Sequence, residues 1–181
     1  MTCIVGLKHR GSVYIGGDSA GVGSYKIETR LDPKVHEVGP FLFGFTSSFR
    51  MGQLLGHSFK PPRHPKGMDT YKFMVTLFID AIRSCLKSGG YAKTNDGEES
   101  GGTFLVAYKG RLFTIYDDYQ VAETADDFAS VGCGEDIAKG AMFVNNHMPP
   151  AQRIISALTA ASHFSSGVRG PFLIKQQKKT K

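Results

Sequence analysis

The chain has 181 residues, of which 41% are hydrophobic and 21% charged, and its formal net charge is +6. This balance is typical of a globular domain with a buried core, and it excludes disordered and fibrous proteins. We expect a single domain over residues 1–175 and a basic C-terminal tail over residues 176–181.

The positive charge is concentrated in two short segments, residues 59–66 and the last residues of the chain. Nucleic-acid binding needs a patterned basic stripe with aromatic partners, and neither segment has one, so we expect no nucleic-acid partner. No apolar run is long enough to cross a bilayer, and the first residues lack the layout of a secretory signal. The three cysteines are sparse and lack metal-ligand spacing, which predicts reduced thiols, no metal site and a cytoplasmic protein.

The first elements are strands. The runs over 2–8 and 12–19 are of β type and are separated by the turn sequence HRG, which predicts a hairpin. After a Gly-rich connection, the runs over 34–38 and 41–45 predict a second pair of strands, joined through a Gly-Pro turn.

Two helices are expected next. The pattern becomes helical from Ser47 and ends at Phe59, before two prolines. The stretch over 68–90 is the clearest helix, because its apolar residues follow helical spacing, Asp69 or Thr70 can cap its start, and Gly89 can end it.

The second half repeats this order. Residues 91–102 are polar and Gly-rich and are expected to be a connection without regular structure. The runs over 103–109 and 111–118 predict a hairpin across a glycine, and a short strand within 126–134 leads into a helix over 135–146.

A further amphipathic helix over 151–164 and a last strand over 170–176 complete the chain. Blocks of strands separated by pairs of helices indicate a layered α+β fold and not an alternating βαβ array. Two sheets packed face to face, with helices outside, would satisfy this order.

Thr2 is a candidate nucleophile. Methionine is commonly removed when a small residue follows it, so Thr2 is expected to become the first residue. It would then carry both a hydroxyl nucleophile and a free α-amine, whose pKa of roughly 7.7–8.0 suits a general base. Asp18 ends the second strand, which the hairpin returns to Thr2, and Lys34 begins the third strand. A cation near the hydroxyl favours its ionised form, and Asp18 would hold that cation in place.

The start of the chain, MTCIVGLKHRGSVYIGGDSAG, resembles that of proteasome β-subunits and bacterial HslV-type peptidases, which are threonine peptidases among the N-terminal nucleophile hydrolases. Thr2, Asp18 and Lys34 match the family's spacing of sixteen residues between each pair. The segments FLFGFTSS and ASVGCGEDIAKGAM resemble two further family segments. The resemblance implies a four-layer αββα sandwich, and it implies that the backbone N–H of Thr46 or Ser47 forms the oxyanion hole.

Two positions depart from the family pattern. Cys133 stands where the family has the serine of a Gly-Ser-Gly segment, which helps to position the amine or its water. Ser166 matches a serine near the C-terminus, but His163 stands in place of the family's aspartate. The resemblance therefore implies supporting catalytic roles for Cys133 and Ser166. The two departures are consistent with an enzyme whose activity is adjusted or reduced.

The leading hypothesis is a threonine-type endopeptidase that needs no metal or organic cofactor. The resemblance implies polypeptide substrates, a homo-oligomeric ring and an unfoldase ATPase partner. One alternative is a catalytically inactive subunit of such a ring. Another is an N-terminal cysteine amidohydrolase or amidotransferase, since TCIVGL resembles the start of class II glutamine amidotransferases. In that case Cys3 would be the nucleophile, after removal of Met1 and Thr2.

Overall fold

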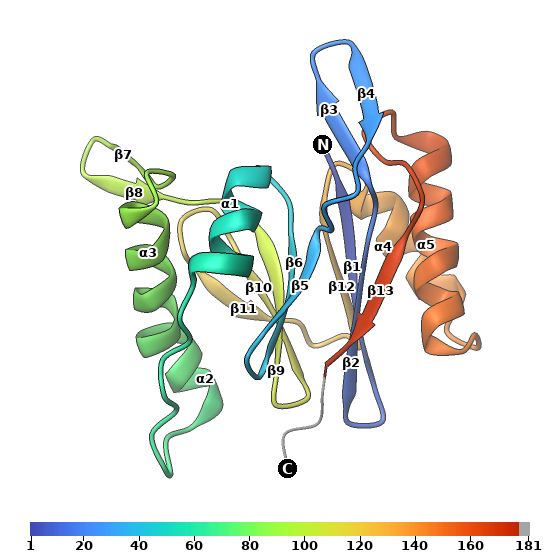
Figure 1. Cartoon of the computed structure of the whole chain (residues 1–181). Helices are drawn as coiled ribbons and strands as arrows, with labels where there is room; N and C mark the ends of the chain where they lie inside the picture. The colour runs from blue at the N-terminus through green and yellow to red at the C-terminus, as the bar shows by residue number, and fades with distance from the viewer. Residues whose placement is uncertain (178–181) are drawn as a thin grey trace.

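The computed structural model describes residues 1–177, which form four layers (Figure 1). The layers follow one another as helices, a five-stranded sheet, a four-stranded sheet and helices (Figure 1). The four-stranded sheet has the order β12 (Phe128–Gly132), β1 (Cys3–His9), β2 (Ser12–Gly17), β13 (Leu173–Gln176). The five-stranded sheet has the order β11 (Val121–Glu123), β10 (Arg111–Ile115), β9 (Phe104–Tyr108), β6 (Phe41–Phe45), β5 (Val35–Val38). This is the expected αββα sandwich.

The helices cover the outer faces of the two sheets. One outer layer consists of α1 (Phe49–Gln53), the π-helical turn η1 (Leu54–Ser58), α2 (Thr70–Phe73), the π-helical turn η2 (Met74–Phe78) and α3 (Ile79–Ser88). The other consists of α4 (Glu135–Val144) and α5 (Pro150–Phe164). No helix within residues 1–177 is long and apolar enough to span a membrane.

Strand β1 is buried on both faces, which explains why its sequence is continuously apolar instead of alternating. Cys3, Val5 and Leu7 pack against α4 and α5, while Ile4 belongs to the core between the two sheets. The sheets approach closely at Gly44, where a Cβ atom would lie 2.5 Å from Cγ2 of Ile4. A side chain at this position would push the two layers apart.

The two expected strand pairs in the first part of the chain, and the pair across Gly110, are present as antiparallel hairpins. The long helical segment begins after Asp69, whose side chain accepts from the Lys72 N–H, and ends at Gly89, as expected. The first helix begins later than expected, because Ser47 has a left-handed φ of 58° and Ser48 is the N-cap.

Two connections contain hairpins that the sequence analysis missed. The Gly-rich connection forms β3 (Ala20–Gly23) and β4 (Lys26–Thr29), and the polar connection forms β7 (Lys93–Asn95) and β8 (Glu98–Ser100). The expectation that residues 91–102 lack regular structure is therefore wrong. Asp96 and Gly97 both have positive φ, as two-residue hairpin turns require, so the turn signal was present in a segment too polar to be recognised as a strand.

Gln177, the last described residue, packs against one end of the sandwich. Gln177 is buried, and its side chain accepts from the Gly110 N–H at 3.1 Å and donates to the Pro40 carbonyl at 3.1 Å. Its own N–H donates to the Val13 carbonyl at 2.8 Å. The folded domain therefore extends past the expected boundary at residue 175, and the rest of the expected tail, residues 178–181, lies outside the described residues.

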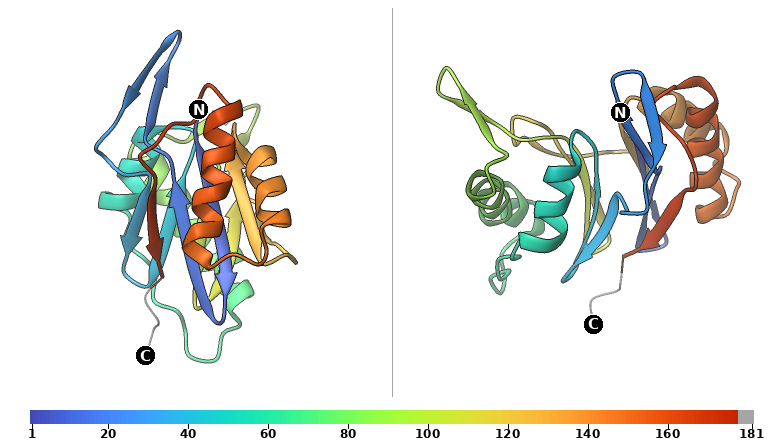
Figure 2. Two further views of the ribbon diagram at one scale, coloured as in Figure 1. Left: turned by 90° about the vertical axis from the view of Figure 1, so that its right-hand side faces the viewer. Right: turned by 45° about the horizontal axis from the view of Figure 1, so that its top comes forward.

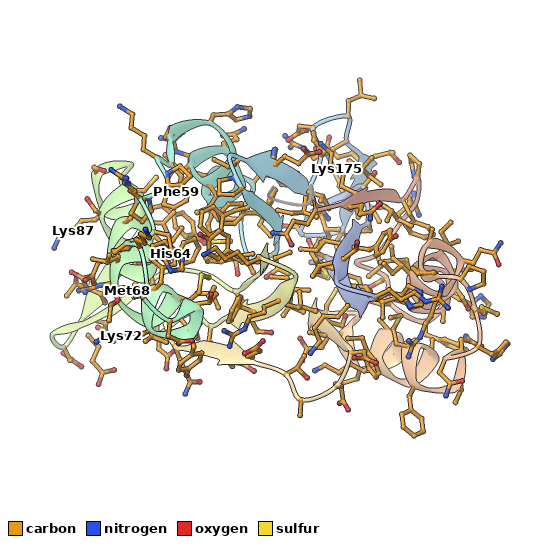
Figure 3. All side chains as sticks on the ribbon, turned by 90° about the horizontal axis from the view of Figure 1, so that it is seen from below. Phe59, His64, Met68, Lys72, Lys87 and Lys175 are labelled. Carbon is orange, nitrogen blue, oxygen red and sulfur yellow. The ribbon has the colours of Figure 1, made fainter. Side chains whose placement is uncertain are left out.

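The connection between η1 and α2 covers the same end on the side of the helices (Figure 3). Within it, His64 contacts the Met68 carbonyl through Nε2 at 2.9 Å and the Tyr108 hydroxyl through Nδ1 at 3.0 Å. Its ring also stacks on Phe73, with 4.3 Å between centroids. These contacts explain why the basic segment around His64 is fixed to the protein and is not a free loop.

Candidate active site

The β1–β2 hairpin places Asp18 beside the start of β1. Ile4 pairs with Gly17 in the sheet, and the Asp18 N–H donates to the Cys3 carbonyl at 3.3 Å. Thr2 immediately precedes β1 and is buried, with 6% of its surface exposed. The upper end of this hairpin therefore brings Thr2 and Asp18 together, although they are sixteen residues apart in the chain.

Lys34 joins these two residues. Its Nζ donates to Thr2 Oγ1 and to Asp18 Oδ1, each at 2.9 Å. The side chains of Lys34 and Asp18 are only 1% and 0% exposed. Asp18 also accepts from the backbone N–H groups of Cys3 and Ala20, both at 2.9 Å. Several donors therefore stabilise the Asp18 carboxylate, and a buried cation lies against the Thr2 hydroxyl.

Burial lowers the pKa of Lys34, and the neighbouring Asp18 carboxylate opposes this effect. The aromatic ring of Phe49 lies 5.6 Å from Lys34 Nζ and adds to its apolar surroundings. An amine with a lowered pKa exchanges its proton more readily near neutral pH than an exposed lysine does. This arrangement suits a group that assists proton transfer at the Thr2 hydroxyl.

Cys133 contacts the main chain of Thr2. The Thr2 N–H donates to Cys133 Sγ at 3.3 Å, and the thiol lies 3.4 Å from the Thr2 carbonyl oxygen. Gly132, before it, has a φ of 104°, and a Cβ atom there would lie 2.3 Å from the Thr2 carbonyl oxygen. The loop between β12 and α4 therefore packs directly on the candidate nucleophile, and glycine is needed for that approach.

The serine that lies beside this thiol is Ser165, and not Ser166, the serine for which the resemblance implies a supporting role. Ser165 Oγ lies 3.4 Å from Cys133 Sγ, whereas Ser166 is exposed and forms no hydrogen bond within residues 1–177. His163 is also exposed, and its ring packs edge-on against Phe164. Within residues 1–177, the structure therefore shows no contact for the supporting role expected of Ser166. Ser165 follows the last residue of α5, so the point where the helix ends decides which serine of the pair reaches Cys133.

The two expected oxyanion donors differ in availability. The Thr46 N–H donates to the Thr103 carbonyl at 3.1 Å and is already used. The Ser47 N–H donates to no acceptor within the described chain, and Ser47 Oγ accepts from the Thr103 N–H at 3.1 Å, which fixes the turn. Of the two candidates, only Ser47 has a free backbone donor.

The space in front of Thr2 has two parts. A small hollow of about 90 Å³ is lined by Met1, Thr2, Val22 and the segment 45–49. A larger pocket of about 610 Å³ opens beside it along the β3–β4 hairpin and shares Val22 and Phe49 with the hollow. The Arg30 guanidinium stacks on Phe49 at 4.0 Å and is held by both carboxylate oxygens of Asp32. The pocket beside Thr2 is therefore bounded on one side by a fixed wall.

The structure does not favour Cys3 as a nucleophile. Cys3 is fully buried, and this burial raises the pKa of its thiol to about 12. Cys133, in contrast, is exposed. Within residues 1–177, no three His, Cys, Asp or Glu side chains are grouped as a metal site would require.

This difference predicts the pattern of alkylation in the folded protein. At pH 8 iodoacetamide should label Cys133 and leave Cys3 unmodified, because roughly one Cys3 thiol in ten thousand would be ionised and none would be accessible. Peptide mass mapping of the native protein and of a urea-unfolded control gives the comparison. Rapid labelling of Cys3 in the native protein would contradict the buried assignment.

No protein-family model matches the chain, and no curated protein sequence matches it. Solved structures do. Thiobacillus denitrificans BPH in complex with epoxomicin has a TM-score of 0.80 at 18% identity, over 99% of this chain and 100% of that chain. HslV from Trypanosoma brucei has a TM-score of 0.66 at 14% identity, over 97% and 98%. Anbu, an ancestral β-subunit from Yersinia bercovieri, has a TM-score of 0.65 at 17% identity, over 97% and 81%.

The chain has the fold of the proteasome-like N-terminal nucleophile hydrolases. At these identities the similarity shows the fold alone. Any activity of this chain has therefore to be inferred from its own residues, above all from the cluster of Thr2, Lys34 and Asp18.

Proposed function

We propose that this protein is a threonine-type endopeptidase that acts through Thr2 once the bond between Met1 and Thr2 has been cleaved. The observation that carries the proposal is the buried cluster in which Lys34 Nζ lies 2.9 Å from both Thr2 Oγ1 and Asp18 Oδ1. A lysine with a purely structural role would need only its carboxylate partner. Lys34 also contacts the Thr2 hydroxyl, which borders an open hollow, and this arrangement suits an activated nucleophile.

In the proposed mechanism the freed Thr2 amine takes the proton of the Thr2 hydroxyl, directly or through a water. Oγ1 then attacks the carbonyl carbon of the peptide, and the Ser47 N–H stabilises the negative oxygen that forms. The protonated amine returns the proton to the departing nitrogen as the C–N bond breaks, which leaves an ester on Thr2. Water, deprotonated by the same amine, hydrolyses this ester.

The surrounding residues hold the reacting groups. Asp18 keeps the Lys34 ammonium against Oγ1, where it favours the ionised hydroxyl. Cys133, supported by Ser165, contacts the Thr2 nitrogen and orients it. A thiol is a weaker hydrogen-bonding partner than a hydroxyl, so Cys133 orients the Thr2 nitrogen less strongly than a serine would.

We extend the proposal to the substrates, the assembly, the partner and the location of the protein. The resemblance to HslV-type peptidases suggests polypeptide substrates, a homo-oligomeric ring, an unfoldase ATPase that delivers substrates, and a cytoplasmic location. The proposed steps use only groups of this chain and water, so the proposal includes no metal or cofactor.

A second candidate is an inactive ring subunit. It is favoured by the exposed position of Ser166 and His163 and by the weak thiol contact at the Thr2 nitrogen. The two candidates share one fold and differ in whether Thr2 reacts.

The deciding experiment is the intact mass of the protein with and without epoxomicin, an epoxyketone whose ring formation needs a hydroxyl and a free amine on one residue. A ubiquitin fusion, cleaved to expose Thr2, makes the result independent of natural Met1 removal. We expect one adduct per chain and none in the Thr2→Ala variant prepared in the same way. A folded chain that begins at Thr2, forms no adduct and cleaves no peptide would favour the inactive subunit.

A further inference from the structure

The loop between β12 and α4 lies against the main chain of Thr2. Gly132 packs on the Thr2 carbonyl, and Cys133 brings its thiol to 3.3 Å from the Thr2 nitrogen. A Cβ atom at Gly134 would lie 3.0 Å from side chains of β1 and α5, so the loop is closely packed on this side as well. In the left view of Figure 2, α4 and α5 face the viewer and the N-terminus lies at the upper end of this layer. Whatever fixes the loop therefore helps to place the Thr2 nitrogen.

Glu135 fixes this loop from its far end. It is the first residue of α4, and its Oε2 accepts from the Gly132 N–H at 3.1 Å. Its Oε1 accepts from Lys139 Nζ at 3.2 Å, one turn further along the helix. A glutamate near a helix start commonly reaches back to the N–H of the N-cap residue. Here the N-cap is Gly134, and Glu135 reaches past it to Gly132, which closes the loop around Cys133.

The residue that Glu135 holds is the one with the most backbone freedom. Gly132 adopts a φ of 104°, which other residues rarely adopt, and glycine has many further conformations open to it. Each of them would move Cys133 relative to Thr2. A hydrogen bond to a charged carboxylate is stronger than one to a neutral acceptor, so Glu135 favours the conformation that directs the thiol to the Thr2 nitrogen.

We propose that Glu135 is a positioning residue for the reaction at Thr2, and that it acts through the Gly132 N–H on the loop from which Cys133 contacts the Thr2 nitrogen. The freed amine has to lie where it can take the proton of the Thr2 hydroxyl, and a displacement on the order of 1 Å can slow such a step about 100-fold. The inference rests on the proposed function, because it concerns the amine that serves there as the base.

Four substitutions separate this role from the other roles of a glutamate at a helix start. Glu135→Ala removes both hydrogen bonds, and Glu135→Gln keeps an oxygen that can accept from the Gly132 N–H. Asp136→Ala is the matched control. Asp136 lies in the same first turn of α4, is exposed, and its side chain forms no hydrogen bond or ion pair within residues 1–177. Lys139→Met removes only the other partner of Glu135.

The first measurement is the hydrolysis of fluorogenic peptides by protein that begins at Thr2. Glu135→Ala should lower kcat about 10- to 100-fold. KM should stay unchanged, because none of the residues 132–135 lines the hollow or the pocket beside Thr2. Glu135→Gln should retain most of the wild-type kcat, and the Asp136 and Lys139 variants should match the wild type. Chemical denaturation shows whether each variant is folded under the assay conditions.

Two inhibitors separate the Thr2 amine from the Thr2 hydroxyl. A peptide aldehyde forms a hemiacetal with the hydroxyl alone, whereas epoxomicin also needs the amine to close its ring. Glu135→Ala should therefore slow the formation of the epoxomicin adduct and leave the equilibrium affinity for the aldehyde unchanged. A merely structural effect on the site would weaken both.

An unchanged kcat in Glu135→Ala would overturn the inference, and so would an equal loss in Asp136→Ala or a parallel loss of aldehyde affinity. A loss in Glu135→Gln as large as that in Glu135→Ala would overturn it as well. If the wild type forms no epoxomicin adduct, the proposed function fails and this inference fails with it. If the wild type and Glu135→Ala form the adduct at the same rate, only the positioning role is overturned and the proposed peptidase stands.

Discussion

Replacing Thr2 with alanine is expected to lower the kcat of peptide hydrolysis by a factor on the order of 10⁴ to 10⁶. The substitution removes the attacking oxygen and leaves the amine, Lys34 and Asp18 in place. Because Thr2 is a small residue that precedes β1, the fold should be retained. The measurement is the turnover of a panel of fluorogenic peptides by protein that begins at residue 2.

The matched control is Thr2→Ser, which keeps the hydroxyl and the amine on the same residue. It should hydrolyse the same peptides and form the epoxomicin adduct. If Thr2→Ala retained full hydrolysis, the nucleophile would have to be sought elsewhere, and the exposed Cys133 would be the next residue to replace.

Replacing Lys34 with methionine is expected to reduce kcat about 10²- to 10³-fold, because it removes the cation that lies 2.9 Å from Thr2 Oγ1. It should also destabilise the fold by about 3–5 kcal/mol, because the buried Asp18 carboxylate loses its counter-ion. Chemical denaturation measures the second effect, and turnover under strongly native conditions measures the first.

The two effects can be separated with Asp18. Lys34→Met combined with Asp18→Asn removes both buried charges, so much of the lost stability should return while kcat stays low. Recovery of activity in this double variant would show that Lys34 has only a structural role. If the double variant regains stability and stays inactive, Lys34 takes part in the reaction.

The pH dependence of stability provides a second readout for Lys34. Burial lowers its pKa in the folded protein, so between that pKa and the ordinary value of 10.5 the unfolded chain binds a proton that the folded chain does not. The contribution of Lys34 to the free energy of unfolding therefore rises with pH across this window and is constant outside it. The rise should be absent from the plot of unfolding free energy against pH for Lys34→Met, so it should appear in the difference between the wild type and this variant.

The sequence determined the features that depend on local pattern and spacing. The HRG turn fixed the first hairpin, and the hairpin brought Asp18 to Thr2, because the end of its second strand must return to the start of its first. Turn residues and helix caps such as Asp69 and Gly89 likewise act on their immediate neighbours. The order of these elements was sufficient to predict a layered α+β fold.

The tertiary structure decided what depends on segments that are far apart in the chain. Pairing of Thr46 with Thr103 uses one of the two candidate oxyanion donors, the Thr46 N–H, and leaves the Ser47 N–H free within the described chain. The end of α5 places Ser165, and not Ser166, beside Cys133. The β3–β4 hairpin formed in a Gly-rich segment without the alternating apolar pattern of a strand. Hydrogen-bond partners and short exposed strands are selected by packing over the whole molecule, so a local pattern cannot specify them.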